Sequence, residues 1–454
     1  MRAFSFLIVL AASFALLWAG CDDSSKGAAE VPLPVEPPAL SPAPLDELPV
    51  VDVYLDATLS MQGFVRPNRS RYDRLLSRLR NLAGSMGLDA RRTTLYKFGS
   101  RVIPLAGEAG GRSALDPSFY EDQRISSTTR LDSVVERVKA GHLSVVVTDL
   151  FQDESNIDLL SRKLVSKVQQ HGFALGIAGI RSAFDGMIYD VGRRNASFPH
   201  EGKRPFYMLV LGRHAAVASL FDEIRQDETI RAKEGDLQFL LLSPNMAMPV
   251  ASFIGGATLE SRTGIAEGSG GTGNSQVKHF RVDRANPQLK VRVRPSLLQH
   301  GPGLDLSRLN TDVSAWQQRR QRRSAQEGDT LQDSKSSFDA SSEAAEAVKS
   351  QFVEVSDTAF TLRTSWKSDM LPDAGTYFYS LVLRPRSESV SPPAWVADWT
   401  LSADSLAYWE DHKQDFPGHQ TLYLQRFLSD LTTATTKAYH PRLAQLYAFV
   451  EYEG

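Results

Sequence analysis

The sequence contains a single cysteine, Cys21, among 454 residues. One cysteine excludes an internal disulfide, a thiolate zinc cage and a CxxC redox pair. There is also no excess of charge, because 51 Lys and Arg stand against 53 Asp and Glu, so the whole chain gives no case for nucleic acid as a partner. A hydrophobic fraction of 42% excludes disorder. The length predicts two or three domains, because a single core rarely grows past about 250 residues.

Familiar catalytic motifs are missing as well. We find no HExxH, GxSxG or CxxC motif and no pairing of serine with histidine at a familiar spacing. The glycine-rich residues 268–275 (GSGGTGNS) are not followed by the lysine of a P-loop, so they predict a flexible linker. With no recognisable nucleophile or general base, the sequence predicts a protein that is not an enzyme.

The amino-terminal segment indicates export. An apolar run covers residues 3–20, after Arg2 and directly before Cys21, which is typical of a secretory signal. Residues 17–21 (LWAGC) resemble a bacterial lipobox, although Trp18 stands where that pattern usually has leucine. The resemblance implies that residues 1–20 are a lipoprotein signal peptide and that Cys21 becomes the lipid-modified first residue. The alternative is an uncleaved single-span anchor, since this run barely reaches across a hydrocarbon core of about 30 Å.

The residues after Cys21 indicate where the protein is held. Asp22 and Asp23 resemble the signal that retains enteric lipoproteins in the inner membrane. We therefore expect attachment through lipidated Cys21 to the cell membrane, the inner one in preference to the outer, with the globular part facing the periplasm or the exterior. Residues 21–49 contain seven prolines, which predict an extended linker.

Residues 50–244 predict an α/β domain. Apolar, β-branched runs predict strands at residues 50–55, 93–98, 143–148, 173–180 and 206–211. Helical spacing of apolar residues predicts helices at 72–82, 131–138, 157–168 and 215–224. This alternation indicates a doubly wound, mostly parallel sheet with helices on both faces. Ligands of such sheets bind at the carboxyl ends of the strands.

Carboxylates and hydroxyls stand at those strand ends. Asp56, Thr58 and Ser60 follow the first strand at alternate positions, Thr129 precedes a predicted helix, and Asp149 follows the central strand. The pattern resembles the metal ion-dependent adhesion site (MIDAS) of von Willebrand factor A-type (vWA) domains. That family's D-x-S-x-S motif matches the first three residues, its loop threonine matches Thr129, and its strand-end aspartate matches Asp149. The resemblance implies a vWA-like fold and a site for Mg²⁺ or another divalent cation.

The same residues allow other interpretations. Hydroxyls after a strand also cap the following helix, and the vWA family includes metal-free interaction modules with degenerate sites. Thr58 replaces the usual serine of the motif, and Leu59 stands where glycine is common. Residues 56–58 also resemble the nucleophile loop of haloacid dehalogenase-like phosphatases, but Thr58 stands where that family needs its second aspartate.

Past residue 244 the pattern changes. Residues 245–276 predict a glycine-rich linker. Residues 277–403 alternate apolar and polar side chains on short strands, which predicts a β-rich, sandwich-like domain with a polar insert at about 315–347. The insert contains a basic run, RRQRR, that predicts a solvated loop.

The last part of the chain predicts one more strand and a helical segment. Residues 395–401 (WVADWTL) predict a strand, and residues 404–454 predict a helical segment with apolar faces at 422–431 and 443–449. Four aromatic residues of this half predict core packing in preference to a binding groove. They are Tyr377, Tyr379, Trp395 and Trp399.

These patterns predict an envelope-anchored, non-catalytic binding or assembly module. Its site would use a divalent cation at Asp56, Thr58, Ser60, Thr129 and Asp149 to bind an envelope protein. Mg²⁺ bound mostly by neutral hydroxyls stays electron-poor, so it can accept an acidic side chain of that partner. The alternatives are a metal-dependent hydrolase of envelope phosphate or sugar esters and a metal-free structural scaffold.

Overall fold

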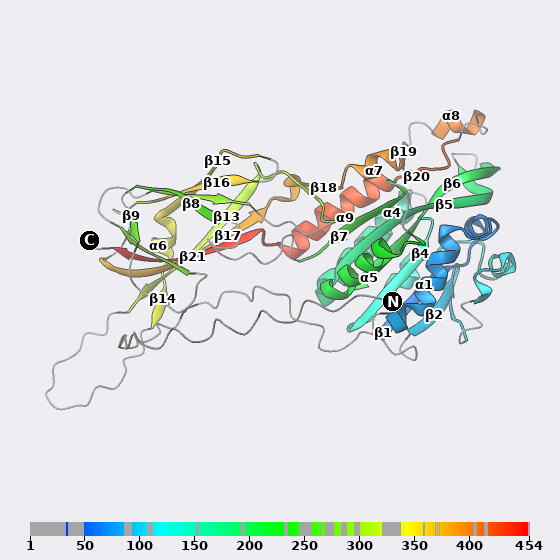
Figure 1. Ribbon diagram of the computed structural model, residues 1–454, viewed down its shortest axis with the longest axis horizontal. Helices are drawn as coiled ribbons and strands as arrows, with labels where there is room; N and C mark the ends of the chain where they lie inside the picture. Colours follow the sequence, from blue (N-terminus) through cyan, green and yellow to red (C-terminus); the bar gives the residue numbers. More distant parts are fainter. Residues whose placement is uncertain are drawn as a thin grey trace, which may run out of the picture.

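The computed structural model shows an α/β part at one end of an elongated molecule and a β-rich part at the other (Figure 1). It describes residues 33–34, 50–85, 93–106, 112–150, 154–191, 196–230, 235–244, 257–263, 265–267, 277–282, 288–294, 300–319, 337–356, 359–367, 369, 371, 373–402, 406–412 and 416–452. The predictions for residues 1–20, for Cys21, for the glycine run 268–275 and for most of the linker 21–49 lie outside these residues. No helix among them is long and apolar enough to span a membrane.

Seven strands form the sheet of the α/β part, in the order β3-β2-β1-β4-β6-β5-β7. β1 pairs in parallel with β2 and with β4, so the centre of the sheet is parallel as predicted. The strands are β1 Val50–Asp56, β2 Thr93–Phe98, β3 Val102–Pro104, β4 His142–Thr148, β5 Ala174–Val191, β6 Ala196–Gly212 and β7 Leu237–Leu242.

Helices cover both faces of this sheet. α1 (Arg71–Ser85) and α5 (His214–Gln226) share one hydrophobic core with β1 and β4. α3 (Leu131–Glu136), α4 (Glu154–His171) and the distant α9 (Leu424–Tyr439) share the core on the other face. This three-layer arrangement confirms the α/β prediction.

The prediction of a mostly parallel sheet is wrong. Only two of the six strand pairings described in this sheet are parallel. β5 and β6 form one long antiparallel hairpin, and β7 adds to β5 in the antiparallel sense. A parallel neighbour requires a crossover connection of a dozen or more residues. Only residues 192–195 separate β5 from β6, so the chain can only turn back on itself.

The carboxyl-terminal half contains two sheets packed on one shared hydrophobic core, as the β-rich prediction expects. Their strand orders are β14-β13-β17-β21-β10-β9 and β15-β16-β11-β8. The strands are β8 Ala257–Thr263, β9 Ile265–Glu267, β10 Val277–Val282, β11 Gln288–Val293, β13 Leu309–Gln318, β14 Phe338–Ala340, β15 Val348–Val353, β16 Phe360–Trp366, β17 Gly375–Pro385 and β21 Ala444–Tyr452. Tyr377, Tyr379 and Trp399 are buried, which confirms core packing for these three.

Smaller elements complete the fold. They are η1 Leu59–Phe64, η3 Pro117–Tyr120, β12 Gly303–Leu304, α6 Ser342–Glu346, η5 Ser387–Ser389, β18 Val390–Ser391, α7 Trp395–Asp398, β19 Thr400–Leu401, α8 Leu406–Asp411 and β20 Thr421–Leu422. β8, β9, α6 and the end of β13 fall in segments that we expected to be linker or polar insert.

Two predictions near the end of the chain are wrong. Residues 395–401, expected as a strand, begin with the helix α7 and only then form the two-residue strand β19. Residues 443–449, expected as an apolar helix face, belong to β21, which lies between β17 and β10. β21 is buried on both faces, so its apolar run has no period of two to distinguish it from a buried helix.

The chain passes between its two parts three times, first between β7 and β8. After β17 it returns to the α/β part, where Leu424, Phe427 and Leu428 of α9 join the core beside α4. Tyr207 of β6 donates a hydrogen bond to Thr421 at 2.8 Å, and Arg426 pairs with Asp158 of α4 at 3.2 Å. The chain then runs back to form β21 of the sandwich (Figure 1). The α/β part therefore contains α9 from the end of the sequence, and the β-rich part is completed by β21, which follows α9.

Candidate functional site

The predicted site lies at the carboxyl ends of two central strands. Asp56 is the last residue of β1, and Asp149 directly follows β4. These strands are parallel neighbours, which places both carboxylates at the same edge of the sheet. Asp56 has 0% and Asp149 2% of its surface exposed.

Asp56 is held by three hydrogen bonds. Its Oδ1 accepts the Thr58 backbone N–H at 3.0 Å and the Thr58 hydroxyl at 2.6 Å, while its Oδ2 accepts the Thr148 hydroxyl at 2.7 Å. The local turn from Asp56 to Thr58 is an Asx-type contact that such residues favour after a strand. The hydroxyl cap that the sequence also allowed does not form at Thr58, which is the N-cap residue of η1 (Leu59–Phe64) but makes no side-chain capping hydrogen bond.

The hydroxyls continue outward from Thr58. Its Oγ1 lies 3.2 Å from the Ser60 hydroxyl and accepts a hydrogen bond from the Thr129 hydroxyl at 3.2 Å. Ser60 and Thr129 are partly exposed, whereas Thr58 is buried. All five predicted residues thus lie at one strand edge, four of them in a continuous hydrogen-bonded chain that leads from the interior to the surface.

Burial changes the acidity of Asp56. Loss of solvent and, as a smaller effect, the nearby negative charge of Asp149 together raise the pKa of Asp56 to about 7, against the lowering effect of the threonine hydrogen bonds. Asp56 is therefore close to half protonated at neutral pH when no metal ion is bound. A cation that bound here would displace this proton.

We expect the stability of the metal-free protein to fall between pH 5 and pH 8 because of Asp56. A carboxyl whose pKa is raised by folding stabilises the native state fully below its unfolded value, and this stabilisation is lost as the pH rises through about 7. The loss across this interval is about 3 kcal/mol. Asp56→Asn should remove it, because the amide can still accept from Thr58 while donating to Thr148. Urea unfolding in a chelator measures both proteins; parallel pH profiles would contradict the expectation.

Sequence reasoning missed Arg204 of β6. Its Nη2 donates to Asp149 Oδ2 at 3.3 Å, and the two side chains are only 3% and 2% exposed. The guanidinium also lies over the Phe184 ring, 5.4 Å from its centre. The sequence signal was one arginine directly before an apolar run, which is equally typical of a solvated strand end. The antiparallel pairing of β6 with β4, in which Tyr207 faces Thr148, brings it to Asp149.

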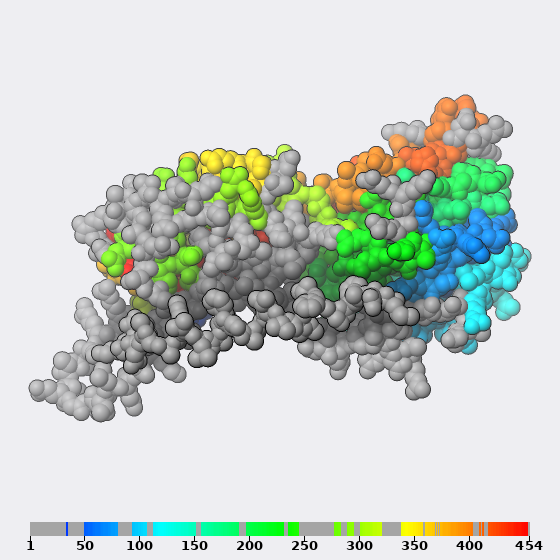
Figure 2. Space-filling view, in the orientation of Figure 1, coloured from blue at the N-terminus to red at the C-terminus, as the bar shows by residue number. Residues whose placement is uncertain are grey.

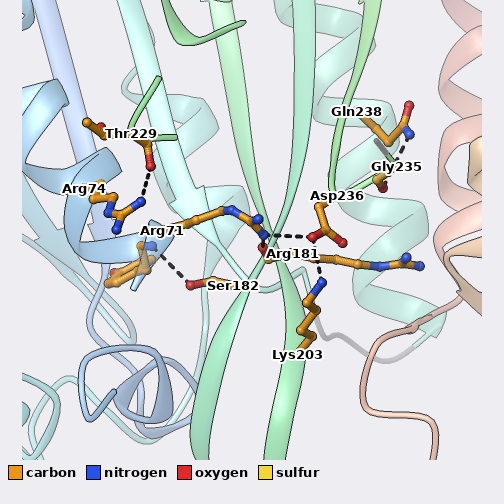
Figure 3. A network of polar contacts seen from close by, with 10 residues as sticks. Arg71, Arg74, Arg181, Ser182, Lys203, Thr229, Gly235, Asp236 and Gln238 are labelled. Atoms are coloured by element: carbon orange, nitrogen blue, oxygen red, sulfur yellow. Dashed lines mark hydrogen bonds and ion pairs between the residues drawn. The ribbon is translucent and has the colours of Figure 1, made fainter. Parts of the chain in front are cut away.

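A second polar cluster holds Lys203, the residue before Arg204 in β6. Asp236 accepts from Arg71 of α1 at 3.0 Å and from Lys203 at 2.7 Å (Figure 3). Arg71 also donates to the backbone carbonyl of Arg181 at 2.6 Å. Successive strand residues point to opposite faces, so Lys203 and Arg204 reach different carboxylates. This cluster joins α1, the hairpin and β7, and leaves Arg204 as the cation that reaches the strand-end site.

The donor set fits a hard divalent cation. Asp56, Thr58, Ser60, Thr129 and Asp149 offer only carboxylate and hydroxyl oxygens, which are the ligands that Mg²⁺ prefers. No group of three or more His, Cys, Asp or Glu that would suit a metal occurs among the described residues, so an ion here would depend on the three hydroxyls. In comparisons with known proteins, no family model, no curated protein and no solved structure matches this chain.

Proposed function

We propose that this protein is an envelope-anchored, non-catalytic binding or assembly module of the vWA type. Its binding face is the strand edge formed by Asp56, Thr58, Ser60, Thr129 and Asp149, and its partner is an envelope protein. In this proposal the five residues hold Mg²⁺ or another divalent cation, which supplies a positive centre for an acidic side chain. Cys21 carries the lipid that holds the module at the membrane.

The gathering of hydroxyls around Asp56, at the strand edge that it shares with Asp149, is the observation that carries the proposal. Five oxygen-bearing side chains come from three separate segments of the chain, and hydrogen bonds of 2.6 to 3.2 Å join four of them. Helix capping does not account for these contacts, because the Thr58 side chain donates to Asp56 and makes no capping hydrogen bond to η1. It does not require Thr129, whose partly exposed hydroxyl opens the chain of oxygens to a partner.

The binding half of the proposal predicts that Mg²⁺ stabilises the protein and that Asp56→Ala abolishes this effect. Saturating Mg²⁺ at about 100 times its dissociation constant should add about 2.7 kcal/mol to the free energy of unfolding. Thermal melts of both proteins, with Mg²⁺ and with a chelator, measure it. Glu346→Ala, an exposed carboxylate of α6, is the matched control and should keep the full response. Equal melting temperatures of the unmutated protein in the two buffers would refute the metal site.

A pull-down from membranes extends this test to the partner. The full-length protein is used as bait with Mg²⁺, with a chelator, and as the Asp56→Ala variant. The proposal expects an envelope protein that is retained only in the first condition. Retention that is equal in all three would mean that the strand edge is not the binding face.

The Arg204–Asp149 ion pair favours a second candidate, the metal-free scaffold. A guanidinium already neutralises one of the two carboxylates, and the raised pKa of Asp56 lets it remain neutral near pH 7. In that case native mass spectrometry would find no bound ion at millimolar Mg²⁺. The partner would then be retained in the presence of the chelator.

A further inference from the structure

We propose that Arg204 is a built-in cation of the strand-end site and that a divalent cation binds there in competition with it. The guanidinium occupies Asp149, and an ion that takes this carboxylate displaces it. Because Arg204 belongs to the β5–β6 hairpin, occupancy of the site is coupled to the position of that hairpin. The inference rests on the proposed divalent-cation site and adds its regulation.

The ion pair between Arg204 and Asp149 is buried. A buried carboxylate is tolerated only when it is paired or protonated. Asp56 is held by three hydrogen bonds from Thr58 and Thr148, and Asp149 satisfies this condition through its ion pair with Arg204 at 3.3 Å. The pair is nearly free of solvent, with 3% and 2% of the two side chains exposed, so water screens it little. Arg204 therefore contributes to stability only as long as Asp149 needs a cation.

The net charge of the site disfavours the binding of a divalent ion beside Arg204. With both carboxylates ionised, the site carries two negative charges and the one positive charge of Arg204. A divalent ion bound beside Arg204 would leave an excess of positive charge in a buried place, whereas an ion that displaces it leaves the site neutral. The electrostatic cost of holding both cations makes their binding mutually exclusive at Asp149.

The β5–β6 hairpin connects Arg204 to η1. Beyond the residues that pair with β4 and β7, β5 and β6 continue as a two-stranded arm, visible where they project past the other strands (Figure 1). Arg204 faces Ser182 across this arm. Phe184, which packs on the guanidinium, also meets Phe64 of η1 at 4.9 Å, edge to face. Arg204 thus links Asp149 to the contact between the arm and η1.

The arm lies close against the loop that carries the site. A Cβ on Gly186 would stand 2.7 Å from the Gly63 Cα, so only glycine allows this approach. Nearer the tip of the arm, Phe198 packs edge to face against Phe416, with the ring centres 5.0 Å apart. α8, close to this segment, stands out from the α/β end of the molecule (Figure 2). The arm is therefore a packed element with two neighbours, and release of Arg204 frees one of its attachments near η1.

The test compares the full chain with Arg204→Met and Arg204→Lys. Removal of the positive charge in Arg204→Met should tighten Mg²⁺ binding, measured by calorimetry, about tenfold or more. The same variant should melt below the unmutated protein in a chelator, because Asp149 loses its ion pair with a buried cation, and Mg²⁺ should restore most of that difference. Arg204→Lys keeps the charge and should bind Mg²⁺ within about threefold of the unmutated protein. Arg204→Gln, which keeps donors for Asp149, replaces the Met variant if that variant does not fold.

The outcomes separate this inference from the proposed function. If the unmutated protein binds Mg²⁺ and the Met and Gln variants bind it no more tightly, competition is refuted while the metal site stands. If none of the proteins responds to Mg²⁺, both ideas fail. Hydrogen exchange gives the second readout: in the unmutated protein, Mg²⁺ should increase exchange of the arm amides in residues 181–188, and unchanged protection there would refute the coupling.

Discussion

Val450→Asp is expected to unfold the β-rich part of the molecule. Val450 has no exposed surface and lies in β21, opposite Phe280 of β10 and Tyr377 of β17. A carboxylate at this position would be buried without a partner, at a cost of several kcal/mol. Because whole domains are stable by only about 5–15 kcal/mol, one such change removes most of the margin. The effect should be large because β21 is an interior strand of the six-stranded sheet.

Fluorescence of buried Trp366 and far-ultraviolet circular dichroism follow this loss during urea unfolding. Glu451→Gln is the matched control, since its side chain is 42% exposed and pairs with Arg281 at 3.5 Å on the outside. A pair of this kind contributes less than about 1 kcal/mol. An unfolding midpoint of Val450→Asp close to that of Glu451→Gln would show that β21 does not hold the sandwich together.

Leu428→Ala in α9 is expected to destabilise the α/β part by about 2–5 kcal/mol. Leu428 is fully buried in the core that α9 shares with α4, on the face of the sheet opposite α1 and α5. Loss of its side chain leaves a cavity between helices that are far apart in the sequence. The loss of stability should therefore be detectable in α4, residues 154–171, although the substitution is at residue 428.

Hydrogen exchange of α4 amides, together with urea unfolding, measures this coupling. Gln425→Ala changes an exposed position on the same helix and should alter stability by no more than about 0.5 kcal/mol. If Leu428→Ala leaves the protection of α4 unchanged, then α9 is not a structural part of the α/β half.

The sequence allowed the strand-end residues to be predicted because each follows a strongly apolar run. Residues 50–55 and 143–148 read as strands without ambiguity, so the aspartates after them could be placed at one edge of a sheet. β2 was predicted with its exact bounds for the same reason. These elements have local patterns that match their final environment.

Arg204 and β21 could not be found in this way, because their roles depend on pairing between distant segments. Arg204 reaches Asp149 through the antiparallel pairing of β6 with β4, in which Tyr207 faces Thr148. β21 is apolar on both faces because it is covered on both, and a run of that kind fits a buried helix equally well. The parallel-sheet prediction failed similarly, since the antiparallel pairing of β6 with β4 and of β5 with β7 also joins separate segments of the chain.

The position of β21 also determines when the sandwich can be completed. Every other strand of both sheets precedes β21 in the sequence, so β10 and β17 must wait with open backbone edges until that segment has been synthesised. Contacts this distant in sequence make folding slow. Open edges of buried strands are also prone to pair with other chains in the meantime. Nascent chains of this protein therefore pass through an interval in which a chaperone that shields β-strand edges would decide the folded yield.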